Sequence, residues 1–242
     1  MAKIAAKDIR IYLAQYALHG FLNAFDLATK QEVPLVTAFS DAGPRRVIGN
    51  YDYKMDIGGF FDGADGQIDT IIAALRGATA DQYVSAQPTG NSNGSLSYEA
   101  LCHLSAEPIA ARSGDAVLLS ATLEGINQLG RGVVISTAEQ TVSGTGAGTG
   151  ANMGVTTSGQ VFAAVVRVLS GTFTSVTVQI RESSDNAAGD PYALISGMSV
   201  TRTTAGATRV TTTAATEAWK QHNVSAFAGT SCIIMVTAAT MR

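Results

Sequence analysis

The sequence is poor in the residues that build metal and catalytic sites. It holds three histidines and two cysteines among 242 residues, and His103 directly follows Cys102. Neighbouring residues of a strand point to opposite faces, so this pair cannot share a metal ion. We therefore expect no metal, no cofactor and no catalytic residues. We expect Cys102 and Cys232 to be buried, reduced thiols.

Charged residues and long apolar runs are scarce as well. Charged residues make up 14% of the chain, and no stretch approaches the roughly 18 apolar residues that indicate a membrane-spanning helix. The first ten residues, MAKIAAKDIR, are followed by no long apolar core. We therefore expect no secretory signal, no membrane association, and synthesis in the cytoplasm.

The sparse charge is unevenly divided. Residues 1–150 hold 10 Lys and Arg against 15 Asp and Glu, a net charge of −5, whereas residues 151–242 hold 6 against 4, a net charge of +2. Affinity for nucleic acid comes from Lys and Arg contacts to phosphates, so the acidic first part argues against tight binding. It is compatible with a surface past which DNA slides.

Two glycine patterns resemble functional motifs without the context that these motifs need. The pattern GxSxG occurs at Gly90–Gly94, but no helix is expected after it, as a nucleophile elbow requires. Glycines alternate from Gly144 to Gly150 without a following helix, which a dinucleotide-binding loop requires. We interpret the first as a loop and the second as part of a glycine-rich linker, residues 143–154.

Most of the chain has the pattern of short strands separated by turns. In Val47–Phe61, Tyr51, Tyr53, Met55 and Ile57 alternate with polar residues, which is typical of a half-solvated strand. The helical spacing of Ile68, Ile71, Ile72 and Leu75 predicts one helix near Asp65–Arg76 that packs on a sheet. Further strands are expected at Ile9–Leu13, Gly20–Leu27, Tyr98–Leu104, Ala116–Leu123 and Gly132–Ser136.

Six more strands are expected after the glycine-rich segment. They are Val161–Leu169, Ser175–Arg181, Tyr192–Thr201, Thr208–Thr213, Trp219–Val224 and Cys232–Ala238. The sequence thus predicts a mainly β protein with a β domain at residues 1–142, a linker at 143–154, and a second domain at 155–242. The second domain is expected to be a β-sandwich of the immunoglobulin-like or jelly-roll type.

The first domain resembles the major tail tube proteins of long-tailed, siphovirus-like bacteriophages. The matching segments are Ile9–Leu27, Val33–Gly63, Gln67–Gly77 and Pro108–Val134. The family pattern has a T-x-F-x-D/G segment, then a turn, a glycine step, and a strand that ends in G-F-F/W-D before a short helix. These places are occupied by Thr37, Phe39, Gly49, Gly59, Phe60, Phe61 and Asp62.

The resemblance implies a tail-tube-type β-sandwich or barrel whose copies form six-membered rings that stack into a tube. Strands of neighbouring copies then join edge to edge. We expect Asp52, Lys54 and Asp56 to face the lumen, where an acidic surface repels the DNA that passes transiently. The loop with Thr37, Phe39, Asp41, Arg45 and Arg46 is expected to contact neighbouring copies or rings.

The resemblance also implies partners and a location. The partners are further copies and other tail proteins, namely the tape measure, the tail terminator and the baseplate. The location is the virion tail, after synthesis in the host bacterial cytoplasm, with residues 155–242 on the outer surface. Two alternatives remain: a capsid decoration or head-completion protein, and a glycan-binding surface module in which Trp219 and Tyr192 are the available aromatic residues.

Overall fold

A computed structural model describes residues 8–36, 43–47, 51–62, 64, 67–76, 81–110, 117–126, 128–187 and 189–241. The protein is mainly β, as expected, and this part of the chain contains one short helix. No helix within these ranges is long and apolar enough to cross a membrane. Cys102 and Cys232 are buried free thiols, which confirms that expectation.

The chain forms two compact units, each built from discontinuous segments. Unit 1 comprises Met1–Gly20, Gln82–Leu101 and Leu129–Arg242, and unit 2 comprises Phe21–Asp81 and Cys102–Gln128. The boundary expected near residue 150 therefore does not coincide with a boundary between these units, because residues on both sides of it belong to unit 1.

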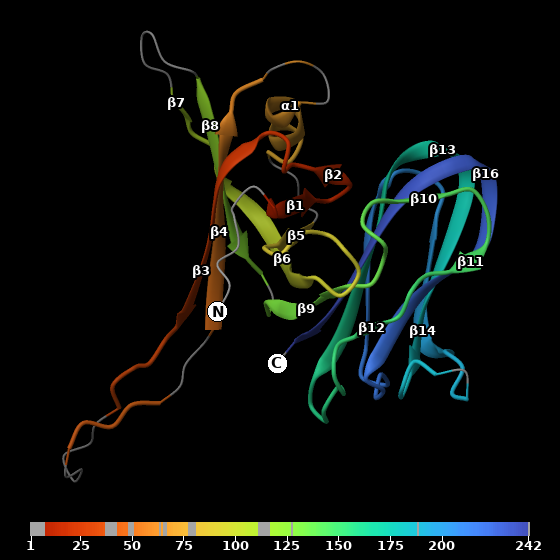
Figure 1. Ribbon diagram of the computed structural model, residues 1–242. Helices are drawn as coiled ribbons and strands as arrows, with labels where there is room; N and C mark the ends of the chain where they lie inside the picture. The colour runs from red at the N-terminus through yellow and green to blue at the C-terminus, as the bar shows by residue number, and fades with distance from the viewer. Residues whose placement is uncertain are drawn as a thin grey trace. The chain divides into compact units, whose positions relative to one another are not determined.

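Unit 2 is built around an antiparallel sheet. Its strands are β3 (Leu22–Gln31), β4 (Tyr51–Phe60), β7 (Ile109–Ala110), β8 (Leu118–Gly125) and the second half of β6 (Leu96–Ala106). β4 lies between β3 and β8, and β8 also pairs with β6 and β7. Figure 1 shows β3 and β4 side by side as a long hairpin.

The helix of unit 2, α1 (Ile68–Ala73), is shorter than the helix expected at Asp65–Arg76. Its apolar residues Ile68, Ile71 and Ile72 are buried, as their helical spacing predicts. Gln67 is the N-cap and makes no capping bond with its side chain. Before the helix, Asp62 accepts a hydrogen bond from the backbone N–H of Ala64 at 3.1 Å.

Unit 1 contains the remaining strands. They are β1 (Arg10–Leu13), β2 (Tyr16–Ala17), β5 (Gln82–Gln87), the first half of β6, β9 (Gly130–Val134), β10 (Gln140–Val142), β11 (Gly146–Ala147), β12 (Ala151–Asn152), β13 (Val161–Ser183), β14 (Ala193–Arg202), β15 (Gly206–Thr212) and β16 (Trp219–Met241). Residue Ser92 lies in the turn segment between β5 and β6, in agreement with the loop interpretation of the GxSxG pattern.

The structure has four strands after the glycine-rich segment where six were expected, because two of the expected pairs of strands are each one continuous strand, β13 and β16. β13 and β16 each span 23 residues and pair along nearly their whole length. β15 pairs with the first half of β13 and β14 with its second half. Both long strands have a glycine with φ of +145°, Gly171 and Gly229, at irregularities in their pairing. A Cβ at either glycine would overlap the opposite backbone, so these positions require glycine.

The halves of β13 and β16 share one hydrophobic core. Val166 and Val178, from opposite halves of β13, belong to the same buried cluster as Val224 and Ile234 of β16. This arrangement agrees with the β-sandwich expected for the C-terminal strands.

The glycine-rich segment expected as a linker is part of this unit. Within residues 143–154, β11 and β12 pair with β16. A Cβ at Gly148 would lie 1.9 Å from the ring of His222, and one at Gly150 would lie 1.8 Å from the hydroxyl of Tyr192. At these two positions glycine therefore allows side chains from later segments to pack directly on the backbone.

Unit 1 also contains a buried ion pair. Arg167 of β13 is fully buried, and its Nη2 lies 3.7 Å from Oε2 of Glu99 on β6. Glu99 accepts hydrogen bonds from the hydroxyls of Ser85 and Ser97. Arg167 Nε donates to the carbonyl of Ala14 at 3.1 Å. Burial lowers the pKa of Arg167. The network joins β5, β6, β13 and the β1–β2 turn.

Candidate assembly surfaces

Strand β4 divides the unit 2 sheet into an apolar face and a polar face. Tyr53, Met55 and Ile57 are buried, whereas Asp52 and Lys54 are exposed and Asp56 is half-buried. The alternation expected from the sequence is therefore present from Asp52 to Ile57, whereas Tyr51, expected on the apolar face, is exposed. On the buried face, the Tyr53 ring lies over Gly125, where a Cβ would come within 2.6 Å of it. Because successive side chains of a strand point to opposite faces, packing of Tyr53 on the buried face directs Asp52 and Lys54 to the other, polar face.

Residues of the flanking strands extend this polar face, and the sequence alone did not reveal them. In the strand register, Asp26 of β3 lies opposite Asp56, Lys30 opposite Asp52, and Glu124 of β8 opposite Lys54. Directly opposite residues share one face of a sheet. With Asp52, Lys54 and Asp56, these residues form what we call the polar face: four carboxylates and two ammonium groups, a net charge of −2.

Local contacts neutralise the lysine at the centre of the polar face. Lys54 Nζ lies 2.9 Å from Asp56 Oδ2, and Thr122 Oγ1 donates to Asp56 Oδ1 at 2.6 Å. The hydrogen bond from Thr122, followed by that from Lys54, lowers the pKa of Asp56. The hydrogen bond and the charge of Asp56 raise the pKa of Lys54. The positive charge of Lys54 on this otherwise acidic strand is therefore balanced by the neighbouring carboxylate of Asp56.

Strand β3 forms an open edge of the unit 2 sheet. Within the described part of the chain, β3 pairs only with β4. It is ten residues long and mostly exposed, with Phe25 and Leu27 half-buried. A long strand with unpaired backbone groups is a template for pairing with another strand. Proteins that stay monomeric usually protect such edges, so β3 is a candidate surface for association.

Beyond β3 and β4 the chain continues as two paired legs, residues 32–36 and 43–47, which we call the arm. Leu35 and Arg46 form a β-bridge, and Val36 donates its backbone N–H to the carbonyl of Arg45 at 2.8 Å. All ten residues of the legs are exposed. Arg45 and Arg46, expected to contact other copies, lie on the arm. Thr37, Phe39 and Asp41, expected at the same place, lie outside the described residues.

The opposite end of β4 carries an exposed apolar surface. Phe60 lies directly opposite Leu118 of β8, and the backbone N–H of Phe61 donates to the carbonyl of Val117 at 2.9 Å. Ile109 of β7 lies beside them, opposite Leu119. We call Phe60, Phe61, Ile109, Val117 and Leu118 the end cluster. All five are exposed, with Phe60 at 54%.

Exposed large apolar side chains are concentrated in unit 2. Among the described residues, 13 such side chains are exposed. Unit 1 holds two of them, Val155 and Leu194. The others lie on unit 2: Val33, Leu35, Val36 and Val47 on the arm, Tyr51 at the start of β4, the five residues of the end cluster, and Ile126. Gathered apolar exposure of this kind marks an interaction surface.

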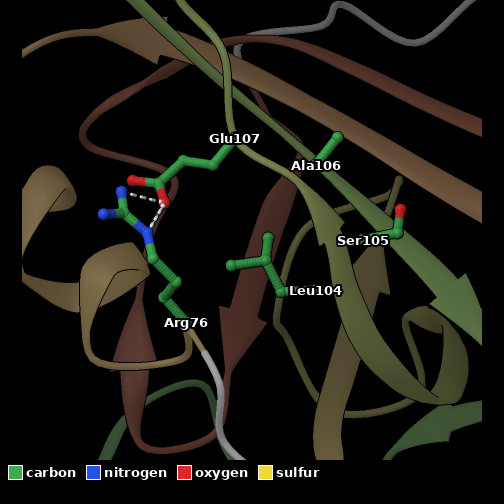
Figure 2. A pocket seen from close by; sticks show the side chains of 5 residues that line it. All are labelled: Arg76, Leu104, Ser105, Ala106 and Glu107. Carbon is green, nitrogen blue, oxygen red and sulfur yellow. Dashed lines mark hydrogen bonds and ion pairs between the residues drawn. The ribbon is translucent and has the colours of Figure 1, made fainter.

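A pocket on unit 2 offers little for a ligand. It has a volume of about 240 Å³ and is lined by Arg76, Leu104, Ser105, Ala106 and Glu107. Figure 2 shows the guanidinium of Arg76 against the carboxylate of Glu107, with Nη2 and Nε 2.7 and 3.1 Å from Oε2. Ligand pockets usually measure about 300–1,000 Å³. This pocket is smaller, and its charged groups already pair with each other.

Comparison with known proteins finds similarity to parts of phage tails. No protein-family model and no curated protein matches the chain. A structure described as the virion of a native gene transfer agent particle is 14% identical over 52% of this chain and 97% of its own, with a TM-score of 0.43. The SPP1 tail tube is 13% identical over 52% of this chain and 77% of its own, with a TM-score of 0.42.

A third similar structure spans nearly the whole chain. The SPP1 Dit protein, described as a paradigm of the hub adsorption apparatus in phages that infect Gram-positive bacteria, is 9% identical. The match covers 97% of this chain and 99% of that protein, with a TM-score of 0.38.

Proposed function

We propose that this chain is a structural protein of a bacteriophage tail, whose copies join into rings that stack into the tail tube. The observation that carries the proposal is the unit 2 sheet, which combines one buried face, one polar face of net negative charge, and an open edge. A sheet with these three properties is suited to form the wall of a conduit when copies lie side by side.

The open β3 edge supplies the means of joining copies within a ring. Main-chain hydrogen bonds between edge strands give affinity without requiring a particular side-chain sequence. Pairing at β3 would continue the sheet from one copy to the next and keep the polar face on one side. That the ring has six copies rests on the sequence resemblance to tail tube proteins.

The polar face is proposed to line the lumen. Its carboxylates, Asp26, Asp52, Asp56 and Glu124, outnumber its ammonium groups, and like charge repels the phosphate backbone. The pairing of Lys54 with Asp56 leaves no isolated cation on the strand to hold DNA. The genome would therefore pass without specific binding.

Residues 155–242, which include strands β13 to β16, are proposed to lie on the outer surface of the tube, as the sequence resemblance implies. Among the described residues of this segment, Val155 and Leu194 are the exposed large apolar side chains, which suits a surface that faces water. At its ends the tube would meet other tail proteins: the tape measure, the terminator and the baseplate. The protein would act in the virion tail after synthesis in the host cytoplasm, with no catalytic role.

The direct test is negative-stain electron microscopy of the purified chain over a wide range of concentrations, with sedimentation velocity on the same samples. Stacked rings with a central hole are expected. Trimers would favour the capsid decoration alternative, and single rings that never stack would limit the protein to one position in the tail. Monomers at every concentration, also when preformed phage tail tips are added as initiators, would overturn the proposal.

Replacing carboxylates of the polar face by lysines tests whether this face lines the lumen. In the variant Asp52→Lys/Glu124→Lys, tubes assembled with labelled double-stranded DNA are expected to retain and protect it from nuclease. The matched control, Asp8→Lys/Asp185→Lys, changes the net charge equally at exposed residues of unit 1. Equal protection by both variants would contradict the assignment of the polar face to the lumen.

One observation favours an accessory glycan-binding role for unit 1. Trp219 begins β16, and the alternation of the strand puts it with Gln221 on the face opposite buried Lys220 and His222. Gln221 lies opposite Arg181 of β13. A half-buried indole beside amide and guanidinium groups is a suitable platform for a sugar. Binding to a glycan panel that is lost in Trp219→Ala would support this role, and a panel without hits would exclude it for the sugars tested.

A further inference from the structure

The outer face of the sheet formed by β14, β13 and β16 carries a single charged group, Arg181. Val178 and Ile180 of β13 belong to the buried core, so the residues that alternate with them lie on the opposite, outer face. Figure 1 shows the three strands side by side. Strand register then defines what we call the outer face: Thr177, Gln179, Arg181, Leu194, Ser199, Thr201, Trp219 and Gln221.

Arg181 has no anionic partner among the residues that the structure describes. Its Nη2 donates to Oε1 of Gln179 at 3.1 Å, and its Nε is buried without a hydrogen-bond partner. The adjacent carboxylate, Glu182, belongs to the other face, where its Oε2 lies 2.7 Å from Nζ of Lys220. A cation positioned by a neutral amide keeps its full charge. The planar guanidinium is therefore available to bind a carboxylate through paired hydrogen bonds.

Apolar side chains flank this cation on both sides. Leu194 of β14 lies directly opposite Arg181 and is 49% exposed. On β16, Gln221 lies directly opposite Arg181, and Trp219 is its diagonal neighbour, a relation that separates residues by about 7–8 Å. The face of an indole carries partial negative charge and attracts the C–H bonds of a sugar ring. The outer face thus combines a platform for a sugar ring with a fixed cation beside it.

We infer that the outer face binds an acidic glycan built from hexuronic acids, with the sugar carboxylate on Arg181 and the pyranose ring on Trp219. The inference rests on the accessory glycan-binding role proposed above and adds the chemical class of the sugar. In a hexuronate the carboxylate is attached directly to the ring, so one sugar contacts both residues. A neutral sugar leaves the guanidinium without an anion, and a polyol phosphate chain has no ring for Trp219.

A fluorescence titration of the full chain tests the ligand class. Trp219 is the only tryptophan of the chain, so intrinsic tryptophan fluorescence reports on this site directly. The probes are tetramers of galacturonate and of mannuronate, their methyl esters, and a glycerol phosphate tetramer. We expect a saturable change in fluorescence with a hexuronate tetramer that requires more ligand as NaCl is raised. Its uncharged methyl ester should bind roughly tenfold more weakly.

Variants of the cation test its role at the site. Arg181→Gln removes the charge and should weaken hexuronate binding roughly tenfold. Arg181→Lys keeps the charge without the paired donors and should bind between the two, which also covers the case in which the glutamine perturbs the fold. The matched control Arg131→Gln makes the same charge change at an exposed residue of β9 in unit 1 and should bind like the parent.

Each outcome bears on the inference separately from tube assembly. Equal binding of the acid and its ester would overturn the inference and leave a glycan-binding role standing. Glycerol phosphate bound as tightly as the hexuronates would also overturn it, because the sugar ring would then contribute nothing. No response to any probe would overturn it as well. Electron microscopy of the same preparation shows whether tubes form, so failure at this site is distinguishable from failure of the proposed assembly.

Discussion

Shortening side chains of the end cluster should weaken assembly, and the exposed fraction of those side chains determines by how much. We consider the double variant Phe60→Ser/Leu118→Ser, which changes two residues that lie directly opposite each other on β4 and β8. In the folded chain Phe60 is 54% exposed and Leu118 is 44% exposed, so about half of each side chain remains to be buried by a neighbour.

The expected loss follows from the hydrophobic effect. Complete burial of a Leu or Phe side chain contributes about 1.5–3 kcal/mol. Half of this is about 1 kcal/mol for each residue, or about 2 kcal/mol for each contact between copies. Since 1.4 kcal/mol corresponds to a factor of ten in an equilibrium constant, the critical concentration for tube formation should rise roughly 20- to 30-fold.

The assay is ultracentrifuge pelleting over a concentration series, with the concentration left in the supernatant taken as the critical concentration. The thermal unfolding midpoint should change little, because both residues are half-exposed in the free chain. The control Leu194→Ser removes a leucine of unit 1 that is 49% exposed. An unchanged critical concentration in the double variant, or an equal rise in the control, would refute the reasoning.

Three further predictions concern the fold and the polar face. Glu99→Gln leaves the buried guanidinium of Arg167 without its carboxylate and should lower the free energy of unfolding by about 3–5 kcal/mol. The double variant Glu99→Gln/Arg167→Met should regain part of this free energy of unfolding. Urea denaturation measures both variants. Gly148→Ala should cost about 1–3 kcal/mol because its Cβ overlaps an imidazole ring, whereas Gly146→Ala, with nothing within 4 Å of its Cβ, should melt near the parent temperature. Thr122→Val should raise the pKa of Asp56 toward its ordinary value, since the Thr122 hydrogen bond is the largest cause of its lowering. The lowered pKa of Asp56 stabilises the folded chain at pH values above the ordinary carboxyl pKa, and this stabilisation is lost as the pH falls through the pKa of Asp56 in the folded state. In the variant that pKa is higher, so the stabilisation should be lost at a higher pH. NMR titration of the carboxyl group and acid denaturation measure the two effects.

Local patterns were enough to predict the faces of individual elements. The alternation around Tyr53 and Met55 identified the buried face of β4, and the spacing of Ile68 and Ile72 located the helix. Such predictions succeed because side-chain direction repeats every two residues in a strand and every 3.6 in a helix. They concern one element at a time and need no knowledge of its neighbours.

Local patterns did not predict the features that depend on contacts between segments distant in the chain. The glycines of residues 143–154 resemble a linker, and only the structure places His222 and Tyr192 over two of them. The strands expected on either side of Gly171 and Gly229 are continuous in β13 and β16, because the two strands pair with each other on both sides of these glycines. The division into units also escaped a linear reading, since each unit combines segments far apart in the chain.

The sequence by itself determined that the protein is mainly β and that β4 presents Asp52, Lys54 and Asp56 on one face, because both follow from local periodicity and composition. Only the tertiary structure decided that Asp26, Lys30 and Glu124 join that face, and that most of the exposed large apolar residues gather at the arm and the end cluster. These features depend on strand register and on which residues the fold leaves uncovered. Both are set by pairing between segments distant in the chain, which no local pattern contains.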